Sequence, residues 1–384
     1  MNQYGEVRCD MSKKIAIVTW IKYYNFGTFL QAYALQAELL KLGYDPCLLD
    51  DRTIVEEGRQ VVSRSNVLKR LYYSCRQLLI DLYRKGLTYY LKEKQSIRLY
   101  NRFRHRYLNV DMHIQPLSAL DERYDVFVCG SDQIWYPSSM IFSPYYYLGF
   151  TQKKKIAYAP SMGTSRYPEI FKPKVKPLWD RFYRLSVREQ IGADIVGSIV
   201  GKKVPAVLDP TLLLDRKDWE ELVTENTFCK QEYVLCYLLT YNETYIHFVV
   251  DYARRHSLQI VSFALVGQRN DFANKLLTAG PREFLSAIKY AKVVFTDSFH
   301  ATIFSLHFRK MFYTFKRFTD GDPNNQNSRV NNLLQLVELQ NHFVSMDNLE
   351  KLDCLPAIDY DKVELKLLSE RNKSIQYLKE ALED

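Results

Sequence analysis

The sequence lacks the patterns that mark several large classes of protein. No run approaches the ~18 consecutive apolar residues of a membrane-spanning helix, and the first ten residues are polar, so neither a membrane span nor export is expected. The seven cysteines are scattered, with no CxxC pair and no metal-type spacing. This pattern predicts no metal site and favours buried thiols in a reducing compartment, the cytoplasm.

Several catalytic signatures are missing as well. The sequence has no Walker A loop, no GxGxxG, no HExxH and no GxSxG elbow, so metal-dependent and nucleophilic-serine chemistry are poorly supported. No internal repeat and no low-complexity linker divides the chain, which argues against a solenoid. A length of 384 residues exceeds one compact core and suits two domains.

Positive charge is concentrated in one segment. The whole chain carries a net charge of +9, and residues 66–107 alone hold eleven Lys or Arg against two acidic residues. Seven tyrosines and several leucines at helical spacing accompany them. The segment is expected to be a basic helical insertion, either lying on an anionic membrane or solvated, with Lys and Arg covering a local core. No nucleic-acid motif accompanies the charge, so nucleic acid is not expected as a partner.

Short apolar runs alternate with helical patterns, which predicts an α/β protein with parallel sheets. The predicted strands are 14–19, 46–49, 124–129, 155–159, 185–188, 233–240, 258–264, 292–296 and 311–315. The predicted helices are 29–42, 174–184, 189–199, 243–255, 281–291, one from residue 299, and 361–383. We expect two doubly wound domains, 11–203 and 204–345, facing each other across a cleft, and a C-terminal helical segment, 346–384.

Four polar segments follow predicted strands, where parallel sheets bind ligands. In the first, Asn25, Gly27 and Thr28 open a helix. Gly27 allows close approach of the backbone, and the free N–H groups of the helix start favour an anion. The plainer interpretation is a helix cap.

The second segment follows the strand 124–129 and contains Ser131, Asp132, Gln133 and Trp135. Its hydroxyl and carboxylate groups suit sugar hydroxyls, and Trp135 offers a ring face. An Asx-type turn with a tryptophan in the core explains the same residues equally well.

The third and fourth segments carry the charged and titratable candidates. Arg188 ends a strand as a helix begins and presents a planar fork for carboxylate or phosphate, although an ion pair with Glu189 is the simpler alternative. Asp297, Ser298 and His300 follow an apolar strand and open another helix. His300 is the candidate general acid or base.

Together these segments resemble the polysaccharide pyruvyl transferase family, from about Lys14 to Leu336 outside the basic insertion. The motifs that carry the resemblance are NFGTFLQAYAL (25–35), YDVFVCGSDQIW (124–135), LSVRE (185–189), VLDPTLLL (207–214) and GPREFLSAIKYAKVVFTDSFHATIFS (280–305). The resemblance implies a fold like that of the GT-B glycosyltransferases, with two Rossmann-like domains and a C-terminal helix that crosses back.

The resemblance also implies transfer of pyruvate from phosphoenolpyruvate to a sugar as a cyclic ketal, with no other cofactor. His300 would be the acid or base, Arg188 the anion clamp and Asp297 a third catalytic residue, with Arg329 as a weaker anion-binding candidate. The remaining polar residues would line the cleft: Asn25, Gly27, Thr28, Ser131, Asp132, Gln133, Trp135 and Ser298.

Bacterial members usually act in the assembly of surface polysaccharides, often on sugars carried by a lipid diphosphate. This implies a galactose-type acceptor linked to a polyprenyl diphosphate, and contact of residues 66–107 with the inner face of the membrane. Two alternatives stay open on the same fold: a glycosyltransferase that uses a nucleotide sugar, and a non-catalytic sugar-binding module.

Overall fold

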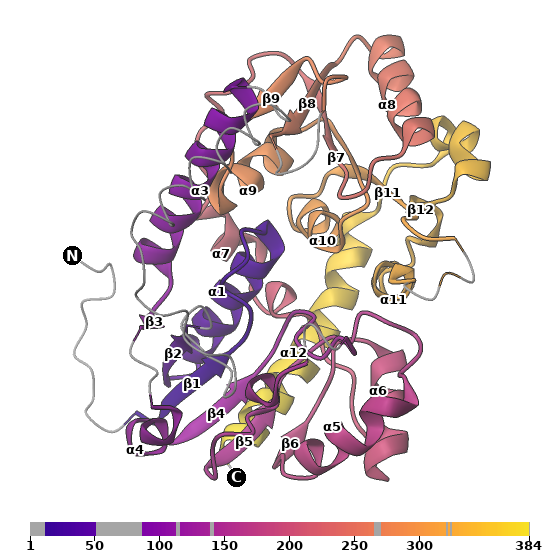
Figure 1. Ribbon diagram of the computed structural model, residues 1–384. Helices are drawn as coiled ribbons and strands as arrows, with labels where there is room; N and C mark the ends of the chain where they lie inside the picture. Colours follow the sequence, from indigo (N-terminus) through magenta and orange to yellow (C-terminus); the bar gives the residue numbers. More distant parts are fainter. Residues whose placement is uncertain are drawn as a thin grey trace.

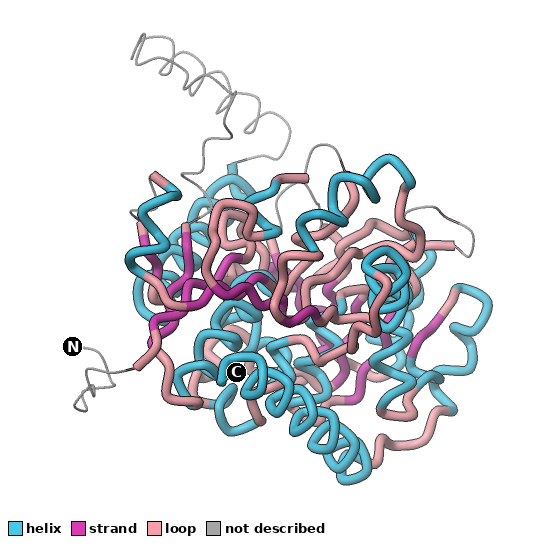
Figure 2. The backbone as a smooth tube through the Cα atoms, turned by 90° about the horizontal axis from the view of Figure 1, so that it is seen from below, coloured by secondary structure: helices cyan, strands magenta, loops and turns pink. Residues whose placement is uncertain are grey.

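Two six-stranded parallel sheets form the framework of the protein (Figure 1). The computed structural model describes residues 12–50, 87–112, 116–138, 142–264, 270–319, 322 and 325–383. Helices lie on both sides of the strands, as the view from below shows (Figure 2). The prediction of two Rossmann-like α/β domains is therefore confirmed.

The first sheet has the strand order β3-β2-β1-β4-β5-β6. Its strands are β1 (Lys14–Val18), β2 (Asp45–Leu49), β3 (Val110–Asp111), β4 (Val126–Cys129), β5 (Lys154–Ala157) and β6 (Arg184–Leu185). β1 and β4 lie side by side at the centre, where their apolar runs are covered on both faces. Because the strand order reverses between them, the loops after β1 and β4 frame the crevice in which such folds bind ligands.

Helix α1 (Phe26–Lys41) connects β1 to β2 and is buried along most of its length. It begins at Phe26 rather than at the predicted residue 29, because the Asn25 side chain accepts the N–H of Thr28 at 3.2 Å. Gly43 then adopts a φ of 87°, which favours glycine, and turns the chain into β2. α1 contacts β2 of its own domain and helices α9 and α10 of the second domain, so it forms part of the domain interface.

The other helices of the first domain are α3 (Leu87–Tyr107), α4 (Leu120–Arg123), α5 (Lys172–Trp179) and α6 (Gln190–Val200). α5 ends before the predicted residue 184, because residues 184–185 pair with β5 as strand β6. Sheet pairing decided this boundary over the local helical pattern.

The second sheet has the order β12-β11-β10-β7-β8-β9. Its strands are β7 (Tyr233–Tyr237), β8 (Gln259–Phe263), β9 (Lys275–Leu277), β10 (Val293–Thr296), β11 (Met311–Phe315) and β12 (Phe343–Val344). Its helices are α7 (Arg216–Glu220), α8 (Glu243–Arg255), α9 (Pro281–Tyr290), α10 (Phe299–His307) and α11 (Asn327–Leu336). Strands β3, β9 and β12 were not predicted, because strands of two or three residues carry no detectable period.

The C-terminal helix α12 (Tyr360–Glu383) runs from the second domain to the first (Figure 1). At its start, the Tyr360 hydroxyl donates to the carbonyl of Lys310 beside β11. Further along, Ser374 Oγ accepts the N–H of Leu208 at 3.0 Å, and the Tyr377 hydroxyl donates to the carbonyl of Ala157 in β5 at 3.3 Å. The helix thus ties the two Rossmann-like domains together in a GT-B-like architecture.

Of the basic segment 66–107, residues 66–86 lie outside the described residues, and the rest forms α3. One face of α3 is packed: Tyr100 stacks on Phe26 with ring centroids 5.5 Å apart, and the buried Arg104 donates to the carbonyl of Ile21. The other face carries exposed arginines. No helix in the described part of the chain combines the length and the hydrophobicity of a membrane span.

Candidate active site

The starts of α1 and α10 pack directly against each other at the domain interface. A β-carbon at Gly27 would lie 1.9 Å from Nδ1 of His300, so only glycine fits beneath the imidazole. The Ser298 side chain caps α10 by accepting the N–H of Ala301 at 3.4 Å, and this cap sets the position of His300 two residues later. Tertiary contact therefore brings the first and fourth predicted segments together.

Arg188, Asp209 and His300 form a buried charged cluster. Nη1 of Arg188 donates to Oδ2 of Asp209 at 2.7 Å, and Nε donates to Glu189 at 2.9 Å. Nε2 of His300 lies 3.7 Å from the same Asp209 oxygen. Burial acts to raise the pKa of the Asp209 carboxyl, but His300 and Arg188 hold that pKa well below its ordinary range. Asp209 is therefore a carboxylate at neutral pH.

Two arginines lie against the ring of Phe299, the first residue of α10. The guanidinium carbon of Arg188 is 4.7 Å from the ring centroid, and that of Arg329 in α11 is 5.8 Å from it. Burial and the nearby charge of Arg188 lower the pKa of Arg329 to about 10. The pair of like charges makes this point attractive to an anion.

Three hydrogen-bond donors around Phe299 are buried without a hydrogen-bond partner in the described part of the chain. They are Nη2 of Arg188, Nε of Arg329 and Nε2 of His300, and the last of these has the Asp209 carboxylate at 3.7 Å, beyond hydrogen-bond distance. A buried donor without a partner costs free energy, about 1–3 kcal/mol each, so native proteins keep few of them. Their convergence marks a site that an anionic ligand would complete.

The turn after β4 connects the cluster to α1. Ser131 Oγ lies 3.4 Å from Oδ2 of Asp209, and the Ser131 N–H donates to Gln31 of α1. Asp132, at a φ of 66°, accepts the hydroxyl proton of Thr28 at 2.6 Å. The second predicted segment therefore lies at the cluster, and Thr28 and Asp132 fix each other.

Gln133 bridges the two domains. Its Nε2 donates to Oε1 of Gln326 at 2.9 Å, and the same oxygen accepts from Nη2 of Arg329 at 2.7 Å. Gln133 thereby orients the arginine across the cleft. Gly163 faces the Gln133 amide so closely that a β-carbon there would lie 2.0 Å from Nε2.

Asp297 has a different environment from the one the sequence suggested. Its carboxylate oxygens accept the N–H groups of Leu239 at 2.6 Å and Thr240 at 3.0 Å, and one of them lies 3.6 Å from Arg317. Burial raises the pKa of the carboxyl, against these hydrogen bonds and the arginine. Asp297 is therefore engaged with the loop after β7, beside the cluster.

Trp135 corrects the sequence interpretation. The ring is fully buried, stacks on Tyr147 at 5.4 Å, and donates from Nε1 to the carbonyl of Tyr146 at 3.1 Å. A ring inside the core cannot offer a face to a sugar. The alternative of a core tryptophan is the correct one, because Trp135 belongs to a hydrophobic cluster in which its ring contacts Trp179 of α5.

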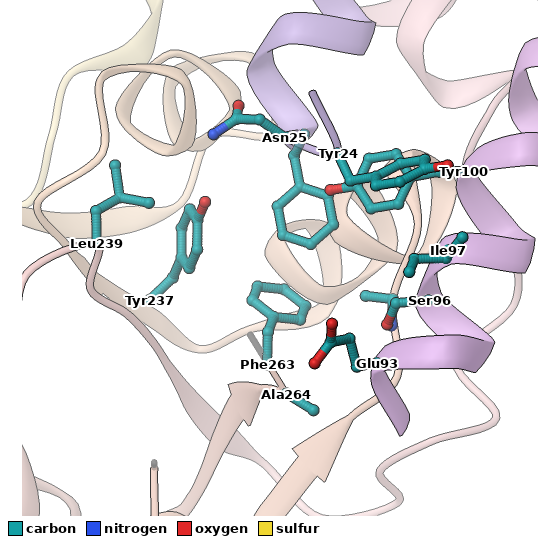
Figure 3. Close-up of a pocket in the computed structure, with 12 residues that line it drawn as sticks. Tyr24, Asn25, Glu93, Ser96, Ile97, Tyr100, Tyr237, Leu239, Phe263 and Ala264 are labelled. Carbon is teal, nitrogen blue, oxygen red and sulfur yellow. The ribbon is translucent and has the colours of Figure 1, made fainter. Parts of the chain in front are cut away.

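A pocket of about 190 Å³ opens between the domains beside α1 (Figure 3). Asn25 is exposed at its edge while its side chain caps α1. The pocket residues are Tyr24, Asn25, Phe26, Glu93, Ser96, Ile97, Tyr100, Tyr237, Leu239, Phe263, Ala264 and Ala279.

Sequence reasoning missed Asp209, Phe299, Gln326 and this pocket. Asp209 stands in the VLDPTLLL motif, where a carboxylate directly after an apolar run was a usable signal. Among the described residues, no group of three or more His, Cys, Asp or Glu side chains could hold a metal ion.

Comparisons with known proteins identify the family. The family model for polysaccharide pyruvyl transferase matches residues 25–317. Similar solved structures include a UDP-N-acetylglucosamine 2-epimerase, with 10% identity, a TM-score of 0.49, and 97% of this chain and 95% of that chain covered. Another is the UDP-GlcNAc 2-epimerase of Methanocaldococcus jannaschii in complex with UDP-GlcNAc and UDP, with 14% identity, a TM-score of 0.44, and 97% and 99% covered.

A third similar structure is the glycotransferase of kitacinnamycin, with 13% identity, a TM-score of 0.44, and 96% of each chain covered. No curated protein sequence matches the chain. The family model spans most of the chain and includes Arg188, Asp209 and His300. The protein therefore belongs to the polysaccharide pyruvyl transferase family.

Proposed function

We propose that the protein transfers pyruvate from phosphoenolpyruvate to two hydroxyl groups of a sugar, which gives a cyclic ketal. The observation that carries this proposal is the set of three buried donors around Phe299, on Arg188, His300 and Arg329. Phosphoenolpyruvate presents a carboxylate and a phosphate, and these are the acceptors that charged nitrogen donors bind best.

The reaction balances without a cofactor. A proton adds to the methylene carbon of phosphoenolpyruvate, and a sugar hydroxyl attacks the resulting oxocarbenium-like carbon. Phosphate leaves, and a second hydroxyl attacks the same carbon to close the ketal. One hydroxyl proton ends on the new methyl group and the other on the released phosphate.

His300 is the proposed proton carrier. Its ring sits at the start of α10, held from below by Gly27 and from the side by Asp209. A carboxylate at 3.7 Å stabilises positive charge that develops on the ring during proton transfer. Asp297 would act as a positioning residue, because its oxygens already bind backbone N–H groups.

Arg188 and Arg329 are the proposed anion clamp. Nε and Nη1 of Arg188 already donate to Glu189 and Asp209, so Arg188 would bind the anion through Nη2 alone and not through two nitrogens at once. Nε of Arg329 would supply the second contact. A bound anion would also relieve the repulsion between the two guanidinium groups.

The assay that tests this function measures phosphate release from phosphoenolpyruvate with a panel of aryl and lipid-linked galactosides. The His300→Ala variant is the control, and thermal shifts with phosphoenolpyruvate and with UDP-sugars are measured in parallel. Acceptor-dependent release that the variant abolishes is the expected result. A thermal shift with a UDP-sugar but not with phosphoenolpyruvate would instead favour a nucleotide-sugar glycosyltransferase.

The proposed setting is the assembly of a bacterial surface polysaccharide, capsule or exopolysaccharide, on a galactose-type sugar linked to polyprenyl diphosphate. Exposed Lys94, Arg98, Arg102 and Arg106 on the outer face of α3 support a peripheral contact with the cytoplasmic side of the membrane. Arg104 is buried and takes no part in this surface.

Co-sedimentation with vesicles of anionic phospholipid tests the membrane contact. Replacing Arg98, Arg102 and Arg106 by Gln should abolish binding at low salt, whereas replacing Lys172 and Lys176 of α5 by Gln should not. Wild-type protein that stays in the supernatant at low salt would rule the contact out.

A further inference from the structure

The pocket beside α1 is built by both domains and by α3. Figure 3 shows Tyr24 and Asn25 from the start of α1, Ser96 and Tyr100 from α3, and Phe263 from the end of β8 around one space. α3 is held against the second domain, because Ser96 Oγ accepts the N–H of Ala279 at 3.2 Å. The helix of the basic segment is therefore a wall of the pocket.

The chemistry of the pocket fits a neutral ring. Its walls are largely aromatic, with Phe26 stacked on Tyr100 and Phe263 packed edge-on against Tyr237. Among the described residues that line it, none is Lys, Arg or His, and the acidic residue is Glu93. The cationic groups that attract an anionic donor such as phosphoenolpyruvate lie instead at the cluster around Phe299, on Arg188 and Arg329.

The size of the pocket limits the occupant to one ring. An apolar cavity of about 150 Å³ holds a benzene molecule, and this pocket measures about 190 Å³. A pyranose has apolar C–H faces that pack on aromatic rings and hydroxyl groups along its edge. Ligand sites commonly combine apolar walls with a few polar groups that fix orientation, and here Asn25, Glu93 and Ser96 supply polar groups. Oδ1 of Asn25 caps α1 and Oγ of Ser96 accepts the N–H of Ala279, so these two residues would act on a ligand as donors, through Nδ2 and the hydroxyl hydrogen.

The pocket also adjoins the reacting groups. Asn25 and Phe26 line it, and the next residue, Gly27, touches the ring of His300. Leu239 also lines the pocket, and its N–H donates to Asp297 just before α10. A sugar in the pocket would lie beside the edge of the cleft at which His300 is held.

We infer that this pocket binds one hexose ring of the acceptor, and that α3 sets acceptor specificity through Glu93 and Ile97. The inference rests on the proposed function, because it assigns the acceptor half of that reaction. Glu93 accepts hydrogen bonds from hydroxyl groups of the sugar, and Ile97 limits the space at the rim.

Two variants on α3 test the inference, each with a matched control. Glu93→Gln keeps the shape but removes the charge of the acceptor group, and its control, Lys94→Gln, removes a charge from the exposed face. Ile97→Trp fills the pocket, and its control, Ile97→Leu, keeps the volume. Thermal melts confirm that each variant is folded.

The first measurement is binding of methyl hexosides to the wild-type chain by calorimetry, with the galacto, gluco and manno forms. Methyl glycosides are chosen because an aryl group would itself bind among the tyrosines. A hexoside that binds should bind roughly 10–100-fold more weakly to Glu93→Gln, which is the usual cost of a lost charged hydrogen bond. Ile97→Trp should abolish binding, Ile97→Leu should retain it because the volume is kept, and Lys94→Gln should match the wild type.

The second measurement is the thermal shift with phosphoenolpyruvate, which all four variants should retain. Failure of every methyl hexoside to bind the wild type would overturn the inference, and so would equal binding to Ile97→Trp. Loss of the phosphoenolpyruvate shift in the pocket variants would also overturn it, because the pocket would then serve the donor. If the wild-type chain binds hexosides but not phosphoenolpyruvate, the proposed function is wrong, and the assignment of the pocket to a hexose still holds.

Discussion

Gly27 of α1 packs directly against the imidazole of His300 in α10, and a methyl group at position 27 would displace that ring. A β-carbon at position 27 would lie 1.9 Å from Nδ1 of His300. The contact crosses the domain interface, so the position of His300, the proposed proton carrier, depends on how tightly the two domains pack.

The Gly27→Ala variant is therefore expected to lose activity far beyond its loss of stability. A displacement of about 1 Å at a reacting group costs on the order of 100-fold in rate, so kcat for phosphate release should fall by that factor. The control is Gly192→Ala in α6, where the new β-carbon would meet Val187 at an ordinary 3.5 Å. An unchanged kcat in Gly27→Ala would contradict the role of His300.

The Arg329→Gln variant should weaken donor binding without weakening the free protein. Burial and the nearby charge of Arg188 lower the pKa of Arg329 to about 10, so the charge of Arg329 is less favourable in the folded chain than in water. We expect a melting temperature equal to or above the wild type, together with a rise of roughly 10–100-fold in the KM for phosphoenolpyruvate. Arg317→Gln, which removes the partner of Asp297, serves as the comparison. A lowered melting temperature with an unchanged KM would assign Arg329 to structure alone.

The Trp135→Phe variant should lower stability and leave substrate affinity unchanged. The smaller ring loses the hydrogen bond to the Tyr146 carbonyl and part of the stacking on Tyr147. Core substitutions of this kind cost about 1–3 kcal/mol, which urea unfolding can measure. If the acceptor KM rose instead, Trp135 would belong to the sugar site after all.

His307 makes the protein sensitive to acid. Burial lowers its pKa to about 4, and its Nε2 donates to the carbonyl of Thr211 at 2.8 Å as a neutral ring. In the unfolded chain the ordinary pKa is about 6.5. Between these two pH values the unfolded state binds a proton that the folded state does not. The contribution of His307 to the free energy of unfolding is therefore fully present above pH 6.5, and it is lost as the pH falls toward 4.

The expected loss is up to about 3 kcal/mol, at roughly 1.4 kcal/mol for each unit of pKa. Urea unfolding at several pH values measures it. His307→Gln, which keeps a donor for Thr211, should flatten the dependence between pH 6.5 and 4. The exposed His247→Gln variant should keep the wild-type slope. Parallel slopes for wild type and His307→Gln would show that other groups carry the acid sensitivity.

Local chemistry was enough to predict the elements that carry the site. The run KIAIV predicts β1, and Asn25 followed by an apolar period predicts the start of α1, because burial and capping depend on neighbouring residues. The same reasoning placed Arg188 and His300 after strands. These residues follow strands of two different sheets, and they meet because the two domains pack with those strand ends facing each other.

Other assignments depended on contacts between distant segments. Trp135 and Asp209 both follow apolar runs, yet one fills the core and the other pairs with Arg188. Nothing local separates the two cases, because burial of a ring or of a carboxylate is decided by what packs over it.

The sequence by itself determined the α/β class, the family, and the segments that bear the chemistry, since periodicity, capping and motif order are properties of neighbouring residues. Only the tertiary structure decided that Asp209 joins Arg188 to His300, that Trp135 is a core residue, and that α3 walls a pocket. Each of these depends on a contact between residues far apart in the chain, whose formation reflects the packing of two whole domains rather than any local preference.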